Sequence, residues 1–528
     1  EIIKNIKFTN YFNIGNRTQA IKTAVLKAEP GEIILVAGKG HEKEQIYKNK
    51  IISISDSQII KRLKIKIKRL SNINFTFLQN KKILKNILIN TKVGNFHGLA
   101  IDSRAVKKDN IFLTLKGKNN DGVKFISKAL EKGAKYIASS RRINNKIKKV
   151  FKIKNEKKFL NNFASQKRDK TTSKIIAITG SAGKTSLKNL IKDLLQKFGN
   201  TYCSPKSYNN EYGVPISLSK LKTNHRFGVF EVGMSKKGEI EDLTKLIRPH
   251  IGIITNIGEA HIENFKNVKG IAGAKSEIIK NIQKNGTIIL NRDDKFFNYL
   301  EKKAKIKNLK VLTFGLNKNS DICLKKVITK KNNKVLTIKI INQTLKIIIK
   351  NINYYNVLSS LALLKVLNLE FSQILDFYKN IEPTGGRGKI HKIYRYKKKF
   401  NFIDESYNAN PLSVKNAILN FNSIKKENFK KYLLLGDMLE LGHKSVELHK
   451  SISKVINNSD IDKVFIKGIK TLNTYKNINK NKRGNILQQD SDVDFTFNNI
   501  IANNDYLMIK GSNATGLNIL SKKIIKGQ

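Results

Sequence analysis

The feature that most constrains the fold of this chain is a glycine-rich segment, ITGSAGKTS, at residues 178–186. An apolar run typical of a buried strand precedes it, and a helical pattern with apolar residues at amphipathic spacing follows it. Gly180 and Gly183 would let backbone amides approach phosphate oxygens at the start of that helix. Lys184 would reach the outer phosphates, and the Thr185 hydroxyl would face magnesium. The full Walker spacing has a further glycine where this chain has isoleucine, so we interpret the segment as a shorter phosphate-binding loop.

The apolar runs predict an α/β protein with several domains. Over residues 166–381, short continuous apolar runs alternate with helical patterns, which favours a parallel sheet covered on both faces. Residues 382–528 repeat this alternation after the turn PTGGRG, so they are expected to form a Rossmann-like unit. Residues 80–165 mix short strands and helices. Residues 1–66 form a further α/β fragment in this prediction.

Polar side chains follow two buried strands of the predicted central domain. Glu231 ends the run GVFEVGM, and His261 follows the run GIIT. Lys275 and Glu277 lie on a later helix. Ligands of open α/β sheets bind at the carboxyl ends of the strands, and a buried carboxylate is costly unless it meets a cation. Although each residue has an ordinary structural interpretation when taken alone, together they indicate a magnesium site beside the phosphate loop.

The net charge of +62 raises the alternative of a basic, nucleic-acid-stimulated NTPase. The lysines and arginines are spread along the whole chain, however, and no zinc finger or RGG tract accompanies them. We interpret the charge as a compositional bias toward lysine that also attracts anionic substrates, and we expect no nucleic-acid partner. The two cysteines exclude a disulfide framework and fit a cytoplasmic protein. No apolar run reaches the roughly 18 residues of a membrane span.

Many motifs, in the same order, resemble the Mur ligase family over residues 80–528. TGSAGKTS, SYNNEYGVP, EVGMSKKGEI, TNIGEAHIENF, GAKSEI and NRDD resemble its central domain. FIDESYNANP, LLGDMLELG and MIKGSNAT resemble its C-terminal domain, in the form typical of the D-alanyl-D-alanine-adding members (MurF type). DSRAVKKDNIFLTLKGKNNDGVKF resembles the first domain. The resemblance implies a three-domain ligase with a central P-loop ATPase domain and a Rossmann-like C-terminal domain.

The resemblance also implies a reaction. ATP would phosphorylate the terminal carboxylate of UDP-N-acetylmuramoyl-tripeptide, and the amine of D-alanyl-D-alanine would displace phosphate to give the pentapeptide of peptidoglycan synthesis. Thr185 and Glu231 would hold one Mg²⁺, while His261 and a carbamylated Lys275 would hold a second. Lys184, Lys275 and His261 would be the catalytic residues. Whether the tripeptide ends in diaminopimelate or lysine stays open.

The remaining site residues follow from the same resemblance, motif by motif. The ATP-binding set would be Gly180, Ser181, Ala182, Gly183, Lys184, Thr185, Ser186, Asn291, Asp294, Arg387 and Asp404. The substrate-binding set would be Ser103, Arg104, Asn209, Asn210, Asn408, Asn410 and Lys510.

Several positions depart from the family pattern: Ser207, Ile352, Asn353, Glu405 and Asn513 stand where other residues are usual. None belongs to the phosphate loop. Two alternatives remain within the enzyme class: another Mur-like amino-acid ligase, which the YNANP and GDMLELG segments disfavour, and an inactive relative.

Residues 1–66 resemble the C-terminal end of a different Mur ligase, the type that adds the third amino acid (MurE type). We expect a helix over 17–28, a strand over 32–37, and then the loop GKGHE, in which Gly38 and Glu42 match positions that contact the incoming diamino acid. The rest of that enzyme is missing, so the fragment is expected to be inactive alone. It would be either the tail of a fused upstream ligase, cut at Glu1, or a remnant that only packs.

Overall fold

The computed structural model describes residues 96–526 except 118–119, 144–146, 148, 331–332 and 351, together with short stretches of the first 95 residues. These stretches are 17–27, 36, 45–47, 50–52, 55–57, 59, 80 and 83. The chain divides into two compact units, residues 1–138 with 143–151, and residues 139–142 with 152–528.

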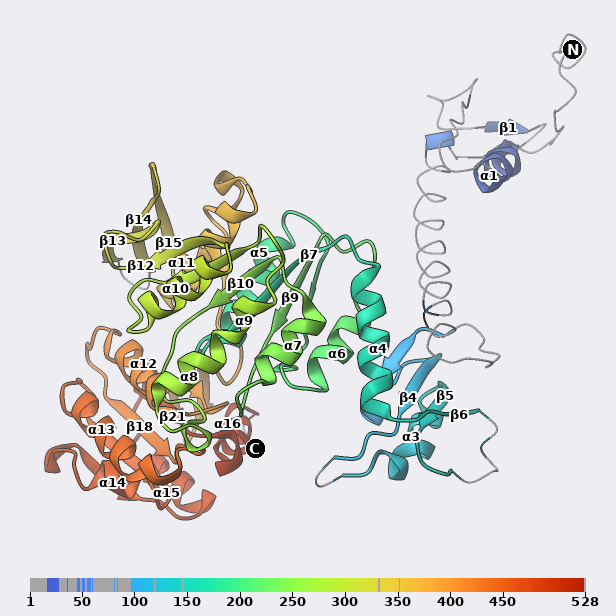
Figure 1. Ribbon diagram of the computed structural model, residues 1–528. Helices are drawn as coiled ribbons and strands as arrows, with labels where there is room; N and C mark the ends of the chain where they lie inside the picture. Colours follow the sequence, from blue (N-terminus) through green and yellow to red (C-terminus); the bar gives the residue numbers. More distant parts are fainter. Residues whose placement is uncertain are drawn as a thin grey trace, which may run out of the picture. The chain divides into compact units, whose positions relative to one another are not determined.

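The first unit contains a small parallel sheet and an N-terminal helix (Figure 1). The expected helix is present as α1 (Arg17–Lys27), and β1 and β2 form a short antiparallel pair. The expected strand over 32–37 and the GKGHE loop lie outside the described residues, apart from Val36. The sheet order is β3-β4-β5-β6, and both the β3–β4 and β4–β5 pairs are parallel. The elements are β1 (Gln45–Tyr47), β2 (Lys50–Ile52), β3 (Gly98–Ala100), η2 (Ser103–Ala105), β4 (Asn110–Leu113), η3 (Gly122–Phe125), α3 (Ile126–Glu131), β5 (Ala134–Ser139) and β6 (Val150–Lys152).

The larger unit is built around two sheets, the first of them nine-stranded. Its order is β15-β14-β13-β12-β11-β10-β7-β9-β8, and the strands from β8 to β13 are parallel, as the sequence predicts. At one edge the sheet is antiparallel, because β13, β14 and β15 form hairpins. The strands are β7 (Lys174–Thr179), β8 (Thr201–Cys203), β9 (Phe227–Glu231), β10 (Ile251–Ile254), β11 (Thr287–Asn291), β12 (Lys310–Gly315), β13 (Ile322–Lys330), β14 (Asn333–Ile340) and β15 (Gln343–Ile349).

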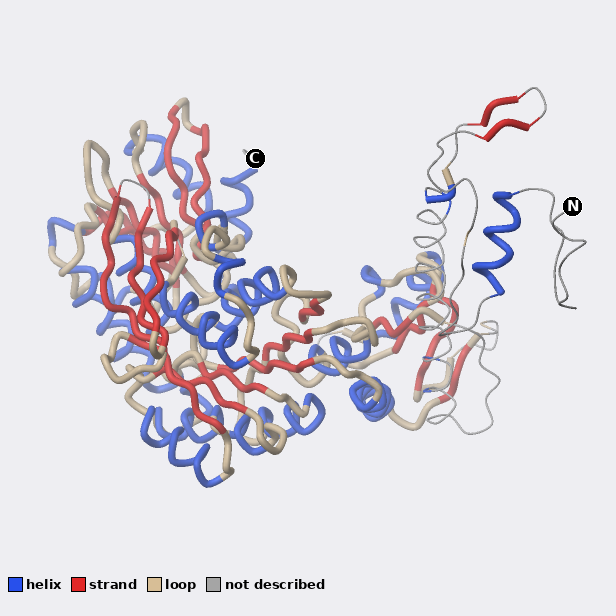
Figure 2. Tube along the Cα trace, turned by 90° about the horizontal axis from the view of Figure 1, so that it is seen from above, coloured by secondary structure: helices blue, strands red, loops and turns tan. Residues whose placement is uncertain are grey.

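Helices cover both faces of this sheet, and alternate side chains of the central strands pack against them. Ile175 and Ala177 of β7 belong to one buried cluster, with residues of α7 to α10, while Ile176 and Ile178 belong to another, with α5 and α11. Successive side chains of a strand point to opposite faces, which is why the strands read as continuous apolar runs. Helices lie on both sides of the strands in Figure 2. The helices are α4 (Glu156–Asp169), α5 (Lys184–Leu195), α6 (Gly213–Ser219), α7 (Glu239–Ile247), η4 (Ile262–Asn264), α8 (Val268–Lys275), α9 (Glu277–Lys280), α10 (Phe297–Ile306), α11 (Tyr354–Val366), η5 (Phe371–Ile374) and η6 (Tyr378–Asn380).

The second sheet has six strands in the order β16-β17-β21-β18-β19-β20. Only the β16–β17 pair is antiparallel, so the predicted Rossmann-like unit has an antiparallel edge. Its elements are β16 (Lys389–Arg395), β17 (Lys398–Glu405), α12 (Pro411–Asn422), β18 (Lys431–Gly436), η7 (Gly442–Lys444), α13 (Ser445–Asn457), β19 (Lys463–Lys467), α14 (Leu472–Tyr475), η8 (Lys480–Lys482), β20 (Arg483–Ile486), α15 (Asp490–Ile500), β21 (Tyr506–Lys510), η9 (Asn513–Thr515) and α16 (Leu517–Lys526).

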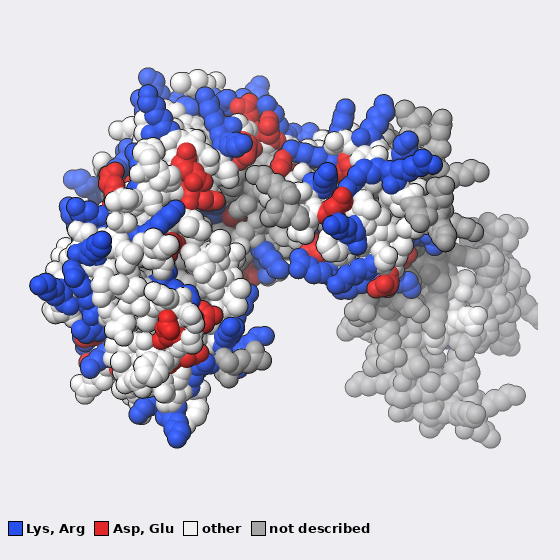
Figure 3. Space-filling model, turned by 90° about the horizontal axis from the view of Figure 1, so that it is seen from below, with Lys and Arg blue, Asp and Glu red and all other residues white. Residues whose placement is uncertain are grey.

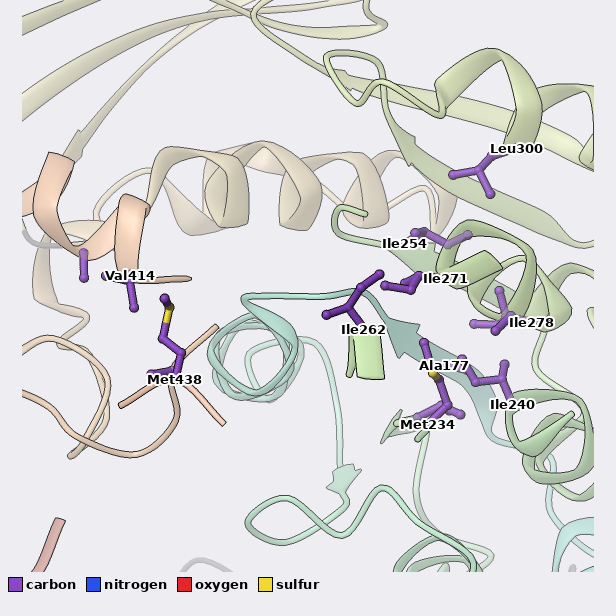
Figure 4. Packing of buried hydrophobic residues seen from close by; sticks show 14 of the residues in the cluster. Ala177, Met234, Ile240, Ile254, Ile262, Ile271, Ile278, Leu300, Val414 and Met438 are labelled. Atoms are coloured by element: carbon purple, nitrogen blue, oxygen red, sulfur yellow. The ribbon is translucent and has the colours of Figure 1, made fainter. Parts of the chain in front are cut away.

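One apolar cluster continues from the nine-stranded sheet into the six-stranded region. Figure 4 shows it from Val414 and Met438 through Ile262 to Ala177 and Ile278. All five are at most 1% exposed. A shared buried core fixes the two sheets relative to each other, because apolar burial is lost when they separate.

No helix within the described part of the chain is both long and apolar enough to cross a bilayer. On the face drawn in Figure 3, lysines and arginines are scattered among acidic and neutral residues and do not form a single basic patch.

Candidate active site

The glycine-rich loop lies between β7 and α5, where the sequence predicts it. Gly180 and Gly183 have φ angles of 147° and 81°, in the region that favours glycine. A Cβ atom on Gly180 would lie 1.9 Å from the hydroxyl oxygen of Thr255. The Ala182 amide donates a hydrogen bond to the side-chain oxygen of Asn256 at 2.8 Å. The segment after β10 therefore braces the loop at close range, and only glycine fits the point of closest approach.

Two lysines converge on the first carbonyl of this loop. The Nζ atoms of Lys184 and Lys275 donate to the Gly180 carbonyl at 2.7 and 3.1 Å. Burial, and then the neighbouring Lys184 charge, hold the pKa of Lys275 well below its ordinary value of 10.5. Burial also lowers the pKa of Lys184, although the Glu231 carboxylate opposes this. The loop thus brings two buried lysines to one carbonyl, and the charged form of Lys275 is the more strongly disfavoured.

Thr185 and Glu231 meet at the end of two adjacent parallel strands. The Thr185 hydroxyl donates to the Glu231 carboxylate at 2.7 Å, and the Asn209 amide donates to its other oxygen at 2.8 Å. Lys188 lies 3.8 Å from the same carboxylate, which is 1% exposed. Hydroxyl and carboxylate oxygens are the hard donors that Mg²⁺ prefers. The oxygens of this pair therefore suit one Mg²⁺, and their role as its ligands stays a prediction.

His261 faces the C-terminal region in this structure. Its Nδ1 atom lies 2.6 Å from the Glu440 carboxylate, a charge contact without the alignment of a good hydrogen bond. The contact with His261 holds the pKa of Glu440 below its ordinary value. Among the residues that the structure describes, no three His, Cys, Asp or Glu side chains cluster as a metal site would require. The second magnesium set, His261 with Lys275, stays a prediction.

Asn291 and Asp294 both brace the segment that follows β10. The Asn291 amide donates to the Thr255 carbonyl at 3.3 Å. Asp294 accepts from the backbone amides of Ile257 and Phe296 at 2.7 and 2.9 Å, while burial raises its pKa. Both side chains support the segment that in turn supports the phosphate loop.

Arg387 and Asp404 come from the C-terminal region, Arg387 from the turn before β16 and Asp404 from the end of β17. Asp404 is buried and accepts from the Gly386 amide at 2.8 Å and from the Ser406 hydroxyl at 2.6 Å. It therefore fixes the turn on which Arg387 stands. The Arg387 guanidinium reaches the Ser207 hydroxyl of the central domain at 3.4 Å.

Asn408, Asn410 and Lys510 lie together at the base of α12. The Lys510 ammonium donates to the Asn408 carbonyl, and also to the Glu405 carbonyl at 3.2 Å. Asn410 caps α12 by accepting from the Ser413 amide at 2.9 Å, and its own amide donates to the Ser181 carbonyl at 3.2 Å. The C-terminal region thus contacts the phosphate loop directly.

Three further candidates have local structural partners. Arg104 pairs with Asp102 at 2.8 Å in the turn η2, which also contains the buried Ser103. Asn210 accepts from the Gly213 amide at 2.8 Å at the start of α6.

Most of the predicted residues of the larger unit line one cleft of about 2710 Å³. They are Ser181, Ala182, Gly183, Lys184, Thr185, Ser186, Asn209, Asn210, Glu231, His261, Asn291, Asp294, Arg387, Asn408, Asn410 and Lys510. Gly180, Lys275 and Asp404 do not line it, and the last two are buried behind its wall. A cleft of this size has room for more than one substrate, since a drug-sized ligand needs about 300–1,000 Å³.

Sequence reasoning gave no role to several residues in or near this cleft. Lys188 is fully buried on α5, where a lysine among the apolar positions of an amphipathic helix is the only sequence signal. Ser207, Tyr407 and Glu440 lie in motifs that the sequence singles out, but their partners are far away in the sequence, so no local pattern predicts these contacts.

Comparison with known proteins agrees with this geometry. Residues 178–364 match the family model of the Mur ligase middle domain, and residues 95–169 match that of the Mur ligase family, catalytic domain. The UDP-N-acetylmuramoyl-tripeptide--D-alanyl-D-alanine ligase of Buchnera aphidicola subsp. Baizongia pistaciae is 30% identical over 440 residues, which are 82% of this chain and 93% of that protein. The ligase of the same name from Rickettsia prowazekii is 32% identical over 391 residues, 72% of this chain and 84% of that protein.

Solved structures share the fold. MurF from Acinetobacter baumannii superposes with a TM-score of 0.72 at 23% identity, covering 85% of this chain and 98% of that chain. MurF ligase from Thermotoga maritima in complex with ADP gives a TM-score of 0.70 at 23% identity, covering 82% and 98%. With a phosphate loop, a braced lysine pair and relatives of 30% identity or more along most of its length, this chain belongs to the Mur ligase family.

Proposed function

We propose that this enzyme joins D-alanyl-D-alanine to UDP-N-acetylmuramoyl-tripeptide, with ATP converted to ADP and phosphate. The observation that carries the proposal is the single cleft in which the phosphate loop meets Arg387, the Asn408–Asn410 segment and Lys510. The relatives with this activity in their names extend over both halves of that cleft. The reaction takes place where UDP-linked precursors are made, so we expect a cytoplasmic enzyme.

The chemistry has two balanced steps. A carboxylate oxygen of the tripeptide attacks the γ-phosphorus of ATP, and ADP leaves. The amine of D-alanyl-D-alanine then attacks the acyl carbon, loses a proton, and expels inorganic phosphate as the amide bond forms. Phosphorylation is needed because a free carboxylate is a poor electrophile.

The residues of the cleft stabilise charge during these steps. Lys184 would contact the transferred phosphoryl group, whose negative charge is spread over its oxygens. Arg387 would approach the same phosphates from the C-terminal side. Thr185 and Glu231 would hold Mg²⁺, which neutralises charge on the phosphates when bound. Ser103 and Arg104 would bind the UDP part, and Asn209, Asn210, Asn408, Asn410 and Lys510 the peptide parts.

Domain boundaries and the origin of residues 1–66 are part of the same proposal. We assign residues 80–165 to UDP-substrate binding, 166–381 to ATP binding and 382–528 to the C-terminal domain. Residues 1–66 would derive from a MurE-type ligase, with or without fusion to the rest of that enzyme. The helix α1 lies where the sequence predicts one, over residues 17–28.

The experiment is phosphate release by the purified chain with ATP, Mg²⁺, UDP-N-acetylmuramoyl-tripeptide and D-alanyl-D-alanine, each omitted in turn. Release that requires both substrates, with pentapeptide in the products, supports the ligase. Polynucleotide-stimulated release without them would favour the NTPase alternative. No release from folded, ATP-binding protein would mean an inactive relative or a different acceptor.

Asn410 provides a first test of the contact between C-terminal region and phosphate loop. Asn410→Asp keeps the helix cap, because Asp and Asn cap equally well. It removes the donor to Ser181 and places a negative charge beside the phosphates. We expect the KM for ATP to rise by about tenfold, the cost of one lost buried hydrogen bond. Thermal unfolding should stay near that of the parent, and an unchanged KM would contradict the contact.

A further inference from the structure

A turn at residues 204–207 lies beside the phosphate-loop helix and is held by a buried lysine. Lys188, one turn after Lys184 on α5, has a side chain that is 0% exposed. Its Nζ atom donates to the Ser204 carbonyl at 2.8 Å and to the Lys206 carbonyl. Lys206 has a φ of 46°, which is unfavourable for a residue with a Cβ atom. The buried ammonium therefore keeps the turn in a conformation that its own sequence does not favour.

The turn presents the Ser207 hydroxyl to three side chains. Ser207 Oγ lies 2.8 Å from the Tyr407 hydroxyl, 3.4 Å from the Arg387 guanidinium and 3.5 Å from the Thr185 hydroxyl. Only the first distance is that of a strong hydrogen bond. Thr185 belongs to the phosphate loop, whereas Tyr407 and Arg387 belong to the C-terminal region. The Ser207 hydroxyl thus contacts both the phosphate loop and the C-terminal region. We call this meeting point the junction.

Arg387 and Tyr407 also contact each other, independently of the turn. The guanidinium carbon of Arg387 lies 4.2 Å from the centre of the Tyr407 ring, within the range of a cation–π contact. Gly386 makes this possible, since a Cβ atom there would lie 2.9 Å from the Tyr407 Cβ. The Tyr407 amide also donates to the Gly386 carbonyl at 3.2 Å. These contacts therefore hold the Tyr407 ring and the Arg387 guanidinium together.

We propose that Ser207 and Tyr407 are positioning residues, whose hydrogen bond docks the C-terminal region on the turn held by Lys188 and places Arg387 beside the Thr185 hydroxyl. Neither residue needs to touch a substrate for this role. A long arginine side chain loses rotamer freedom when it is fixed, and a docked aromatic ring supplies that order before the reaction begins. The inference rests on the proposed ligase function, because the effect of the position of Arg387 is measured as the rate of that reaction.

The test is a double-mutant cycle with Ser207→Ala, Tyr407→Phe and the double variant, measured by pentapeptide formation. We expect each single change to lower kcat by about 3- to 10-fold, the value of one hydrogen bond. The double variant should be no slower than the slower single variant, because both remove the same bond. The Kd for ADP should change by less than about twofold, since the phosphate loop itself is intact. Ser207→Thr, which keeps a hydroxyl, should retain most of the parental kcat.

The matched controls are two hydroxyl groups that lie elsewhere in the molecule and each donate one hydrogen bond. The Tyr475 hydroxyl donates to the Gly484 carbonyl at 2.6 Å within the C-terminal region, and the Ser219 hydroxyl donates to the Ile216 carbonyl at 2.7 Å on α6. Tyr475→Phe and Ser219→Ala should leave kcat near the parental value. A loss of kcat in these controls equal to that in Tyr407→Phe would overturn the proposal.

A second readout does not depend on turnover. Amide hydrogen exchange should become faster at Gly386, Arg387 and Tyr407 in the Ser207→Ala and Tyr407→Phe proteins, and should be unchanged in Tyr475→Phe. Unchanged exchange, or additive effects on kcat in the cycle, would overturn the docking role while the ligase function stands. If the parent protein forms no pentapeptide, the function fails instead, and the exchange experiment still decides whether the junction docks the two regions.

Discussion

Replacing Lys184 with methionine is expected to lower kcat for pentapeptide formation by about a thousandfold or more. Its ammonium stands at the start of α5, 2.7 Å from the Gly180 carbonyl, where the γ-phosphoryl group of ATP would lie. Removal of one preorganised donor to a developing charge costs about 10²–10³ in kcat, and loss of a full cation at a transferring phosphoryl group costs more. Methionine keeps the length of the side chain and removes only the charge and the donors.

The matched control for this variant is Lys192→Met on the same helix. Lys192 lies two turns after Lys184 on α5. Its side chain is partly exposed and pairs with the Asp193 carboxylate at 3.1 Å. Its loss should change kcat by less than about twofold, because an exposed ion pair contributes little. Steady-state pentapeptide formation and ADP release both report the effect. A Lys184→Met enzyme that keeps a tenth of the parental kcat would show that the lysine does not act on the transferred phosphoryl group.

The sequence was sufficient to predict the part of the site that depends on strand ends. Thr185 and Glu231 follow neighbouring parallel strands, β7 and β9, whose register pairs Ile178 with Glu231. Carboxyl ends of parallel strands meet at one edge of a sheet, so the strand prediction placed Glu231 beside the phosphate loop, while its pairing with Thr185 was implied by the resemblance. The same reasoning placed the glycine-rich loop correctly between β7 and α5.

Contacts between distant segments could not be predicted in this way. Ser207 and Tyr407 are 200 residues apart, and His261 meets Glu440 across two sheets. No periodicity or spacing carries such information, because it depends on how one sheet packs against another. The antiparallel strands β13 to β15 were also missed, since they interleave polar with apolar residues and the prediction rested on continuous apolar runs.

The second large effect is expected at Lys275, because its surroundings favour carbamylation of the side-chain amine. Two ammonium groups within about 3 Å of one carbonyl would repel each other, and burial with the Lys184 charge already holds the pKa of Lys275 well below 10.5. A lowered pKa favours the neutral amine over the ammonium. A neutral amine can attack carbon dioxide, form an N–C bond and release a proton. The product is a carbamate, which would turn repulsion by Lys184 into attraction and add a ligand for Mg²⁺.

We expect enzyme equilibrated with ¹³C-labelled bicarbonate to give a carbamate signal in ¹³C NMR that disappears in Lys275→Ala. The same change should lower kcat by roughly a hundredfold, since the site loses a ligand for the Mg²⁺ that would neutralise charge on the transferred phosphoryl group. Lys167, whose pKa is lowered to about 8 by burial, remains in that variant as an internal control. A signal that survives Lys275→Ala would belong to another lysine. An active parent without any carbamate signal would instead mean that Lys275 acts as a neutral amine, whose role is then to leave Lys184 as the only cation at the Gly180 carbonyl.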